Sequence, residues 1–207
     1  MPGVLFEGGS FRAIFSCGVM DALLDQDVMF PYCIGVSAGA ADSASYISRQ
    51  KERNLNMLLR YRNDKRYMGL RNYFKKEHSL FGVDFVFRKM PNVLFPFDMD
   101  TFQNYAGDYV VVTTDANTGK PHYFHKEDVD DRFDVFCASC ALPVYFQAVH
   151  IGGGAYYDGG VSDPVPIRRL QRDGHHKALI VLTRPEGYRK ACGRSDRFAA
   201  GVLRRRY

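Results

Sequence analysis

Apolar and polar positions alternate along the chain in blocks typical of strands followed by helices. The first block, residues 4–7, has three apolar residues and a glutamate and ends at two glycines, as a buried strand does before a tight turn. Residues 32–36 have the same character, and a long helix is predicted from about residue 38 to residue 61. Between these two strands, apolar side chains recur at approximately helical spacing and predict a first helix: Phe11, Ile14, Phe15, Val19, Ala22 and Leu23.

The second half of the chain continues this alternation. Residues 109–114 are rich in β-branched side chains, and the turn at 117–120 predicts a hairpin back to a strand at 121–124. A helix is predicted at 132–141, a strand at 155–160 and a last core strand at 178–183. Strands that alternate with helices predict an α/β sandwich with a largely parallel sheet.

The composition is that of a globular domain. The 207 residues are 46% hydrophobic and 25% charged, and no apolar run approaches the roughly 20 residues that span a bilayer. The N-terminus lacks the features of a signal peptide, so we expect a cytoplasmic protein. Five cysteines without such a signal favour reduced thiols. Cys137 and Cys140 match C-x-x-C, but no second pair completes a zinc site, and both are expected to be core residues of a helix.

The pentapeptide Gly35-Val36-Ser37-Ala38-Gly39 follows the second predicted strand. A G-x-S-x-G sequence places its serine on a sharp strand-to-helix turn, where the hydroxyl stands clear of the backbone as a nucleophile. The glycines give the room that such a turn needs, because side chains at their positions would collide across it. The pattern therefore predicts a nucleophile at Ser37.

Two further glycine-rich turns carry candidate chemistry. After the first strand, Gly8 and Gly9 leave backbone N–H groups uncovered at the start of a helix, which suits an anion or a developing oxyanion. This turn lacks the pattern of a phosphate-binding P-loop, and Ser10 and Ala13 interrupt the dinucleotide-binding pattern. The second turn places Asp158 at the end of a predicted strand, before two glycines.

Together the three turns resemble the patatin-like phospholipase family, over residues 4–170. The resemblance rests on the glycines at 8–9, the pentapeptide at 35–39 and the Asp-Gly-Gly sequence at 158–160, in the family's order. Residues 138–143 also resemble the family segment upstream of its aspartate. The resemblance implies a three-layer α/β/α sandwich with a largely parallel central sheet, in a patatin-like domain at 4–171.

Such proteins are lipid acyl hydrolases that use a serine–aspartate dyad without a histidine. The resemblance implies that Ser37 is the nucleophile and Asp158 the base, acting on a phospholipid or another lipid ester without a metal or other cofactor. It also implies an oxyanion hole made by the backbone amides of Gly8, Gly9 and Ser10. The supporting positions that it implies are Arg12, Gly35, Gly39, Gly159 and Gly160.

The dyad also has a chemical basis of its own. A serine hydroxyl needs an adjacent base, and a partly desolvated carboxylate gains the proton affinity that this task requires. The sequence departs from the family pattern at four positions, but Ser10 keeps its backbone N–H, so the predicted oxyanion hole retains its donors. The departures are Glu7 for aspartate, Ser10 and Ala13 for glycine, and Asp163 for asparagine.

An α/β-hydrolase with a Ser-His-Asp triad is the alternative among enzymes. Ser37, Asp158 and either His175 or His176 occur in the required order. However, the elbow of that fold follows several strands, and only 36 residues precede Ser37, which is room for about two. The two histidines also lie in a polar connection, so the sequence favours the dyad.

Basic residues concentrate between positions 49 and 76, where the local charge is +8 in a chain of net charge +5. Aromatic residues are interleaved with them, which suits an anionic lipid interface or single-stranded nucleic acid. A basic binding module with little catalysis therefore stays open as an alternative. With the three turns present, we expect peripheral contact with an anionic membrane and no nucleic acid. The basic residues are Arg49, Lys51, Arg53, Arg60, Arg62, Lys65, Arg66, Arg71, Lys75 and Lys76.

The rest of the chain, residues 172–207, is expected to hold the last core strand and the start of a helical C-terminal part. Residues 201–207 have the pattern of an amphipathic helix.

Overall fold

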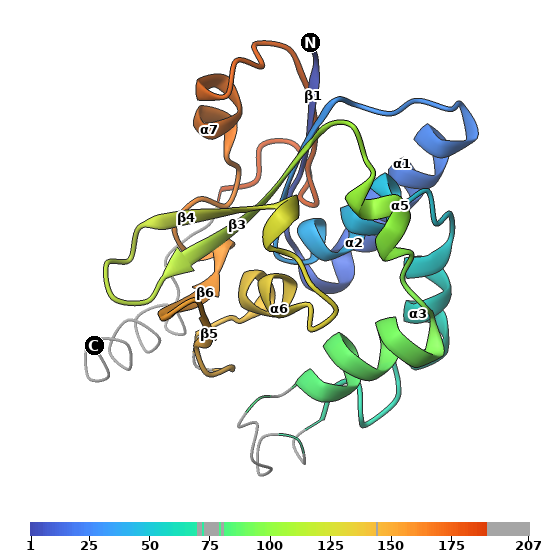
Figure 1. Ribbon diagram of the computed structural model, residues 1–207, viewed down its shortest axis with the longest axis vertical. Helices are drawn as coiled ribbons and strands as arrows, with labels where there is room; N and C mark the ends of the chain where they lie inside the picture. Colours follow the sequence, from blue (N-terminus) through green and yellow to red (C-terminus); the bar gives the residue numbers. More distant parts are fainter. Residues whose placement is uncertain (70–71, 73–78, 80, 144, 190–207) are drawn as a thin grey trace.

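The computed structural model describes residues 1–69, 72, 79, 81–143 and 145–189. In this part of the chain seven strands form one sheet in the order β5-β6-β3-β2-β1-β7, with β4 paired to β3 (Figure 1). The strands are β1 (Gly3–Phe6), β2 (Tyr32–Val36), β3 (Asp108–Asp115), β4 (Pro121–His125), β5 (Val149–Ile151), β6 (Gly154–Asp158) and β7 (Ala178–Val181).

Helices connect these strands and follow most of the predicted positions. The α-helices are α1 (Ile14–Asp25), α2 (Ala38–Ile47), α3 (Arg53–Tyr61), α5 (Met99–Gln103), α6 (Asp134–Cys140) and α7 (Ile167–Arg172). The other helical segments are the 3-10 helices η1 (Ser10–Ala13), η3 (Lys126–Asp128) and η4 (Gly159–Val161), and the π-helix η2 (Phe85–Leu94).

The sheet is mixed. β7, β1, β2 and β3 run parallel, whereas β4 and β6 pair with β3 antiparallel and β5 pairs with β6 antiparallel. The prediction of a largely parallel sheet therefore holds for only four of the seven strands. Short turns join the antiparallel pairs β3–β4 and β5–β6, whereas β6 reaches β3 from a distant part of the chain. The hairpin predicted between β3 and β4 is confirmed, with Gly119 at a φ of +67° in its turn.

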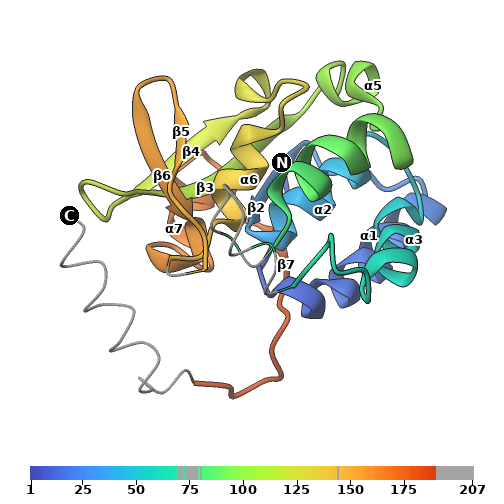
Figure 2. The ribbon, with the colours of Figure 1, turned by 90° about the horizontal axis from the view of Figure 1, so that it is seen from below.

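Side chains alternate between the two faces of the sheet, as strand geometry requires. One set, which includes Phe6 and Val111, packs against buried side chains of α1, α2, α5 and α6. The opposite set, which includes Leu5 and Val110, packs against Leu170 of α7. Figure 1 shows α7 apart from α1, α2 and α5, and Figure 2 shows α1, α2 and α3 together, away from β5 and β6. Helices thus lie on both faces, unequally among the described residues.

The helix predicted from residue 38 to residue 61 is interrupted, which corrects that prediction. A loop separates α2 from α3, and Arg49 and Glu52 in it have left-handed φ angles of 57° and 58°. No glycine or proline marks this break in the sequence. Ion pairs hold the loop against the end of α1: Arg49 lies 2.7 Å from Asp27 and Lys51 lies 2.5 Å from Asp25. The break allows α3 to fold back beside α1 and α2.

Residues 81–107 carried no predicted element, and the structure places η2 and α5 there. The helical C-terminal part expected at 190–207 lies outside the described residues. None of the described helices combines the length and the apolar character that a membrane span requires.

Candidate active site

Ser37 occupies the turn between β2 and α2 in a strained backbone conformation. Its φ of 55° and ψ of −129° lie where residues other than glycine are rare. A Cβ on Gly35 would lie 2.5 Å from the Cα of Ala40, and one on Gly39 would collide with the carbonyl of Phe6. The strand, the turn and the start of the helix predicted around Ser37 are all present.

Strand β3 brings the turn and Asp158 together. Val36, the last residue of β2, pairs with Val112, and Asp158, the last residue of β6, pairs with the next residue, Thr113. β4 pairs along one edge of β3, so β2 and β6 both pair along the opposite edge. On that edge the last residue of β2 and the last residue of β6 lie next to each other. The Ser37 hydroxyl donates a hydrogen bond of 2.7 Å to Oδ2 of Asp158.

The Asp158 side chain is almost completely buried, and 2% of the residue is exposed. Loss of hydration raises the pKa of its carboxyl to about 6, although hydrogen bonds from Ser37 and Gly160 oppose this shift by favouring the ionised form. The Gly160 N–H donates 2.7 Å to Oδ1, which leaves Oδ2 for Ser37. A carboxylate of this kind is ionised at neutral pH and has enough proton affinity to accept a serine proton.

Ser139 and Cys140, at the end of α6, hold the Ser37 turn from another side. The Ser37 N–H donates 2.9 Å to Oγ of Ser139, whose hydroxyl donates 2.7 Å to the carbonyl of Val112. The Cys140 thiol makes a further hydrogen bond with Ser37, and burial together with the nearby Asp158 charge raises the thiol pKa well above its usual range. No contact with Ser37 was predicted for either residue, although both lie in the segment 138–143 that resembles the family.

The turn at Gly8, Gly9 and Ser10 follows β1 and adjoins Ser37. A Cβ on Gly8 would lie 2.8 Å from the Cβ of Ser37, so this approach requires glycine. No acceptor in the described part of the chain takes a hydrogen bond from the backbone N–H of Gly8, Gly9 or Ser10. The turn next to Ser37 therefore contains three backbone donors without an acceptor among the described residues.

Thr183, just beyond β7, holds this turn in place. Its N–H donates 2.5 Å to the Glu7 carboxylate, and its hydroxyl donates 2.7 Å to the Gly8 carbonyl. Glu7, a departure from the family pattern, thus ties β1 to the chain after β7. Arg12, in contrast, is exposed and hydrogen-bonds to neither Ser37 nor Asp158.

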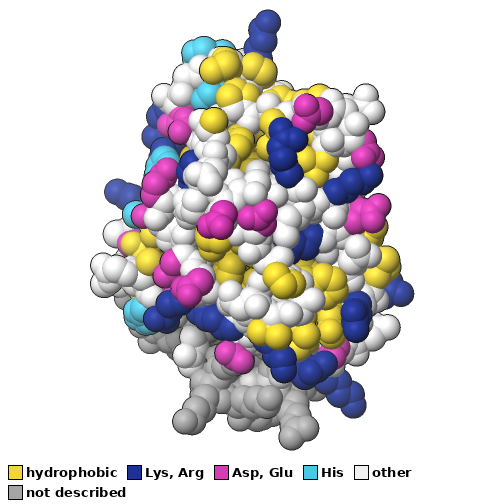
Figure 3. Space-filling model, turned by 45° about the vertical axis from the view of Figure 1, so that its right-hand side comes forward, with side chains coloured by type: hydrophobic (Ala, Val, Ile, Leu, Met, Phe, Trp, Pro, Cys, Tyr) yellow, Lys and Arg dark blue, Asp and Glu magenta, His cyan; other side chains and the backbone are white. Residues whose placement is uncertain are grey.

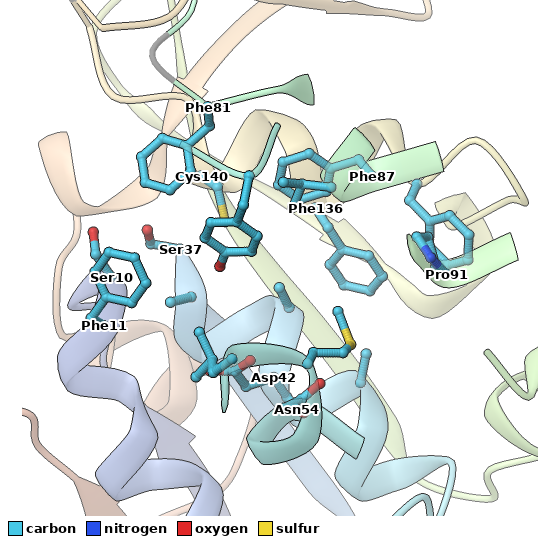
Figure 4. Close-up of a pocket in the computed structure, with 18 of the residues that line it drawn as sticks. Ser10, Phe11, Ser37, Asp42, Asn54, Phe81, Phe87, Pro91, Phe136 and Cys140 are labelled. Atoms are coloured by element: carbon cyan, nitrogen blue, oxygen red, sulfur yellow. The ribbon is translucent and has the colours of Figure 1, made fainter. Parts of the chain in front are cut away.

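A cavity of about 150 Å³ opens beside Ser37 (Figure 4). In this view Ser10 and Ser37 lie at one end of the cavity and Pro91 lies at the other. Aromatic side chains such as Phe81 and Phe136 line much of the space between them. Such a space suits an apolar chain attached to the serine.

The described histidines do not complete a triad. The ring of His175 stacks on Tyr32 with 4.2 Å between ring centroids, and its Nδ1 lies 2.9 Å from the carbonyl oxygen of Met1. Tyr32 is the first residue of β2, and Ser37 follows the last residue of this strand. His175 therefore lies near the opposite end of β2 from Ser37. His176 is its exposed neighbour.

Across the described residues, no group of three His, Cys, Asp or Glu side chains is placed to hold a metal ion. Cys17, Cys33, Cys137 and Cys140 are free of disulfides, and three of them are buried.

A protein-family model and a curated relative match this chain. The patatin-like phospholipase family model matches residues 4–170. An uncharacterized protein of Escherichia coli strain K12, YjjU, is 28% identical over 186 residues, which are 86% of this chain and 51% of that protein. The chain therefore spans about half the length of this curated relative. Since the family model covers most of the chain, this protein belongs to the patatin-like phospholipase family.

Proposed function

We propose that this protein is a serine acyl hydrolase that cleaves the carboxylic ester bond of phospholipids or other lipid esters. Membership of the family supports a lipid hydrolase in general terms. The proposal that Ser37 is the nucleophile and Asp158 its base rests on one observation. Ser37 donates a 2.7 Å hydrogen bond to the buried carboxylate of Asp158, beside an apolar cavity.

The reaction has two halves that share one base. As Oγ of Ser37 attacks the ester carbonyl carbon, Oδ2 of Asp158 accepts the hydroxyl proton. Collapse of the tetrahedral intermediate expels the alcohol, which takes that proton and leaves an acyl group on Ser37. Water then attacks the acyl carbon while Asp158 accepts its proton. The second collapse releases the acid and returns the proton to Oγ.

Backbone donors next to Ser37 would stabilise both intermediates. The N–H groups of Gly8, Gly9 and Ser10 have no acceptor within the described ranges, and the Gly8 backbone lies close to Ser37. Donors fixed in place before the reaction stabilise the negative oxygen of a tetrahedral intermediate without reorganising. The position of Ser37 at the N-terminus of α2 adds a favourable dipole.

Peripheral contact with an anionic membrane is part of the proposal, with fewer cations than the sequence suggests. Several basic side chains are already engaged: Arg49, Lys51 and Arg66 pair with aspartates, and Arg53 lies over the ring of Phe97. Figure 3, in which the side of the molecule with α3 comes forward, shows Lys and Arg side chains next to exposed apolar ones. The exposed cations of 49–69 that pair with no described acid are Arg60, Arg62 and Lys65. Arg71, Lys75 and Lys76 lie outside the described residues.

The function is tested by labelling with a fluorophosphonate probe and by hydrolysis of esters of graded chain length. The wild type should be labelled and the Ser37→Ala variant should not. Ser43→Ala is a matched control, because Ser43 lies on the same helix and its hydroxyl hydrogen-bonds to Ala40 and Tyr109 in the core. Salt-sensitive binding of single-stranded nucleic acid without labelling or hydrolysis would favour the binding-module alternative instead.

A further inference from the structure

Asp42 is an acidic side chain in the wall of a largely apolar cavity. It lies on α2 five residues after Ser37, so it is displaced along the helix axis by about 7.5 Å. Figure 4 shows Asp42 and Asn54 along one side of the cavity, across from Phe136. An extended acyl chain on Ser37 would reach Asp42 at roughly its sixth carbon, given ordinary carbon–carbon bond lengths.

The Asp42 carboxyl has unused hydrogen-bonding capacity. A carboxylate accepts up to about four hydrogen bonds, yet the partner found for Asp42 within the described ranges is the weakly donating thiol of Cys17 on α1. Arg53 on α3 also lines the cavity. Its guanidinium donates 2.8 Å to the carbonyl of Phe95 and 3.1 Å to the hydroxyl of Ser45, and no ion pair joins it to Asp42 in the described structure.

A plain hydrocarbon chain would therefore be a poor occupant of this position. It would displace water from the carboxyl and supply no hydrogen bond, which leaves a buried polar group unsatisfied. A cationic group is disfavoured because Arg53 lies in the same wall. A hydroxyl group fits because it both donates and accepts. Burial raises the pKa of Asp42 to about 7, so both forms of the carboxyl are present near neutral pH, and a hydroxyl bonds to either.

The size of the cavity also agrees with an acyl chain that reaches Asp42 at about its sixth carbon. An engineered apolar cavity of about 150 Å³ in another protein holds benzene, which has six carbons. The cavity here has a volume of about 150 Å³ and accommodates an acyl segment of similar size beyond Ser37.

We propose that Asp42 makes this cavity selective for acyl chains that carry a hydroxyl group on about the sixth carbon, counting the carbonyl carbon as the first. The inference rests on the proposed function and specifies its substrate class.

The test compares two para-nitrophenyl esters of nearly equal shape, those of ω-hydroxyhexanoic acid and heptanoic acid. They differ by a terminal hydroxyl in place of a methyl group. The wild type should favour the hydroxylated ester in kcat/KM by about tenfold or more, because sites built for a hydroxyl discriminate strongly against its absence. The ratio of the two values is taken within each variant, so a general loss of activity cancels.

Three variants sharpen this comparison. Asp42→Leu should abolish or invert the preference, and Asp42→Asn, which can still donate and accept, should keep most of it. Asp21→Asn is the matched control, because Asp21 lies on α1 outside the acyl cavity and should leave the ratio unchanged. The wild-type ratio alone decides the matter if Asp42→Leu does not fold.

The outcomes separate this inference from the proposed function. Probe labelling and acetate hydrolysis by the wild type, with equal kcat/KM for the two longer esters, would overturn the role of Asp42 and leave the hydrolase intact. A preference that survives in Asp42→Leu would overturn it equally. A wild type that neither takes the probe nor cleaves any ester would overturn both.

Discussion

The hydroxyl of Ser37 donates a 2.7 Å hydrogen bond to the carboxylate of Asp158, a residue 121 positions away along the chain. The two are neighbours because adjacent residues of β3, Val112 and Thr113, pair with the last residue of β2 and the last residue of β6. At this distance the proton passes directly from the serine to the carboxylate in the proposed reaction.

Removing either partner should remove most of the activity. Ser37→Ala should abolish probe labelling, and Asp158→Asn should lower kcat by about two to four orders of magnitude, the usual contribution of a positioned base. Steady-state kinetics on a soluble ester and circular dichroism measure activity and fold together. The double variant His175→Ala, His176→Ala is the control and should retain activity, since His175 lies near the opposite end of β2 from Ser37. A loss there as deep as that of Ser37→Ala would support a triad.

The pH dependence should report the ionisation of Asp158. Its pKa is raised to about 6, and the ionised form is the base, so kcat/KM should rise with pH through about 6 and then level off. An acetate ester is the right substrate, because its acyl group is too short to reach Asp42. A rate that stays constant from about pH 7 down to about pH 4 would contradict this role for Asp158.

Folding stability should depend on the ionisation of Asp42. It should fall as pH rises, whereas activity should rise with pH. The folded state holds the Asp42 proton more tightly than the unfolded chain, because its pKa rises from 3.8 to about 7. Stability therefore falls as pH rises through this window. Asp42→Asn should raise the free energy of unfolding by about 1–3 kcal/mol at about pH 8 and change it little at about pH 4.

Urea denaturation of Asp42→Asn and the wild type at the two pH values measures this difference. Cys17, Arg53 and Tyr67 surround Asp42 and are the same in both proteins, so the comparison isolates the carboxyl. Equal effects of the substitution at both pH values would show that the Asp42 pKa is not raised by folding.

The backbone of Gly8 lies close to Ser37, and a methyl group there should impair catalysis. Its Cβ would lie 2.8 Å from the Cβ of Ser37, whereas one on Gly9 would lie 2.6 Å from Oγ1 of Thr183. Gly8→Ala should lower kcat by about a hundredfold or more, the usual loss when an oxyanion donor is displaced. Gly18→Ala is the control, because nothing lies within 4 Å of its Cβ. Full kcat in Gly8→Ala would remove this turn from the mechanism.

Membrane binding should depend on the three exposed cations of residues 49–69 that pair with no described acid. Reversing Arg60, Arg62 and Lys65 to glutamate should weaken binding to anionic vesicles on the order of a hundredfold, since each cation near such a surface contributes about 1 kcal/mol. Vesicle sedimentation at two salt concentrations measures this, because salt screens the attraction. Reversal of exposed cations elsewhere should have a smaller effect: Lys120, Arg168 and Lys177. Equal binding to neutral and anionic vesicles would leave the basic segment without this role.

Local patterns in the sequence were enough to predict the elements that carry the proposed chemistry. The turn at Ser37 needs small residues at Gly35 and Gly39 whatever the rest of the fold does, because a Cβ at either position meets backbone atoms. The short apolar runs predicted β1 and β2, and the turn around Gly119 predicted the hairpin from β3 to β4. These features depend on residues close together in the chain, so the sequence displays them directly.

Contacts between distant segments determined the rest. The break between α2 and α3 carries no local signal, and in the folded chain its residues meet the end of α1, as Arg49 does with Asp27. Likewise, only the folded chain brings Ser139 under the Ser37 N–H and Thr183 onto the Gly8 carbonyl. Asp42 has the sequence of an ordinary helix position, and it becomes a feature of the cavity only when α3 and η2 close over α2. Periodicity records which side of an element is buried, but not which residue of another element it will meet, because that depends on how all the elements pack together.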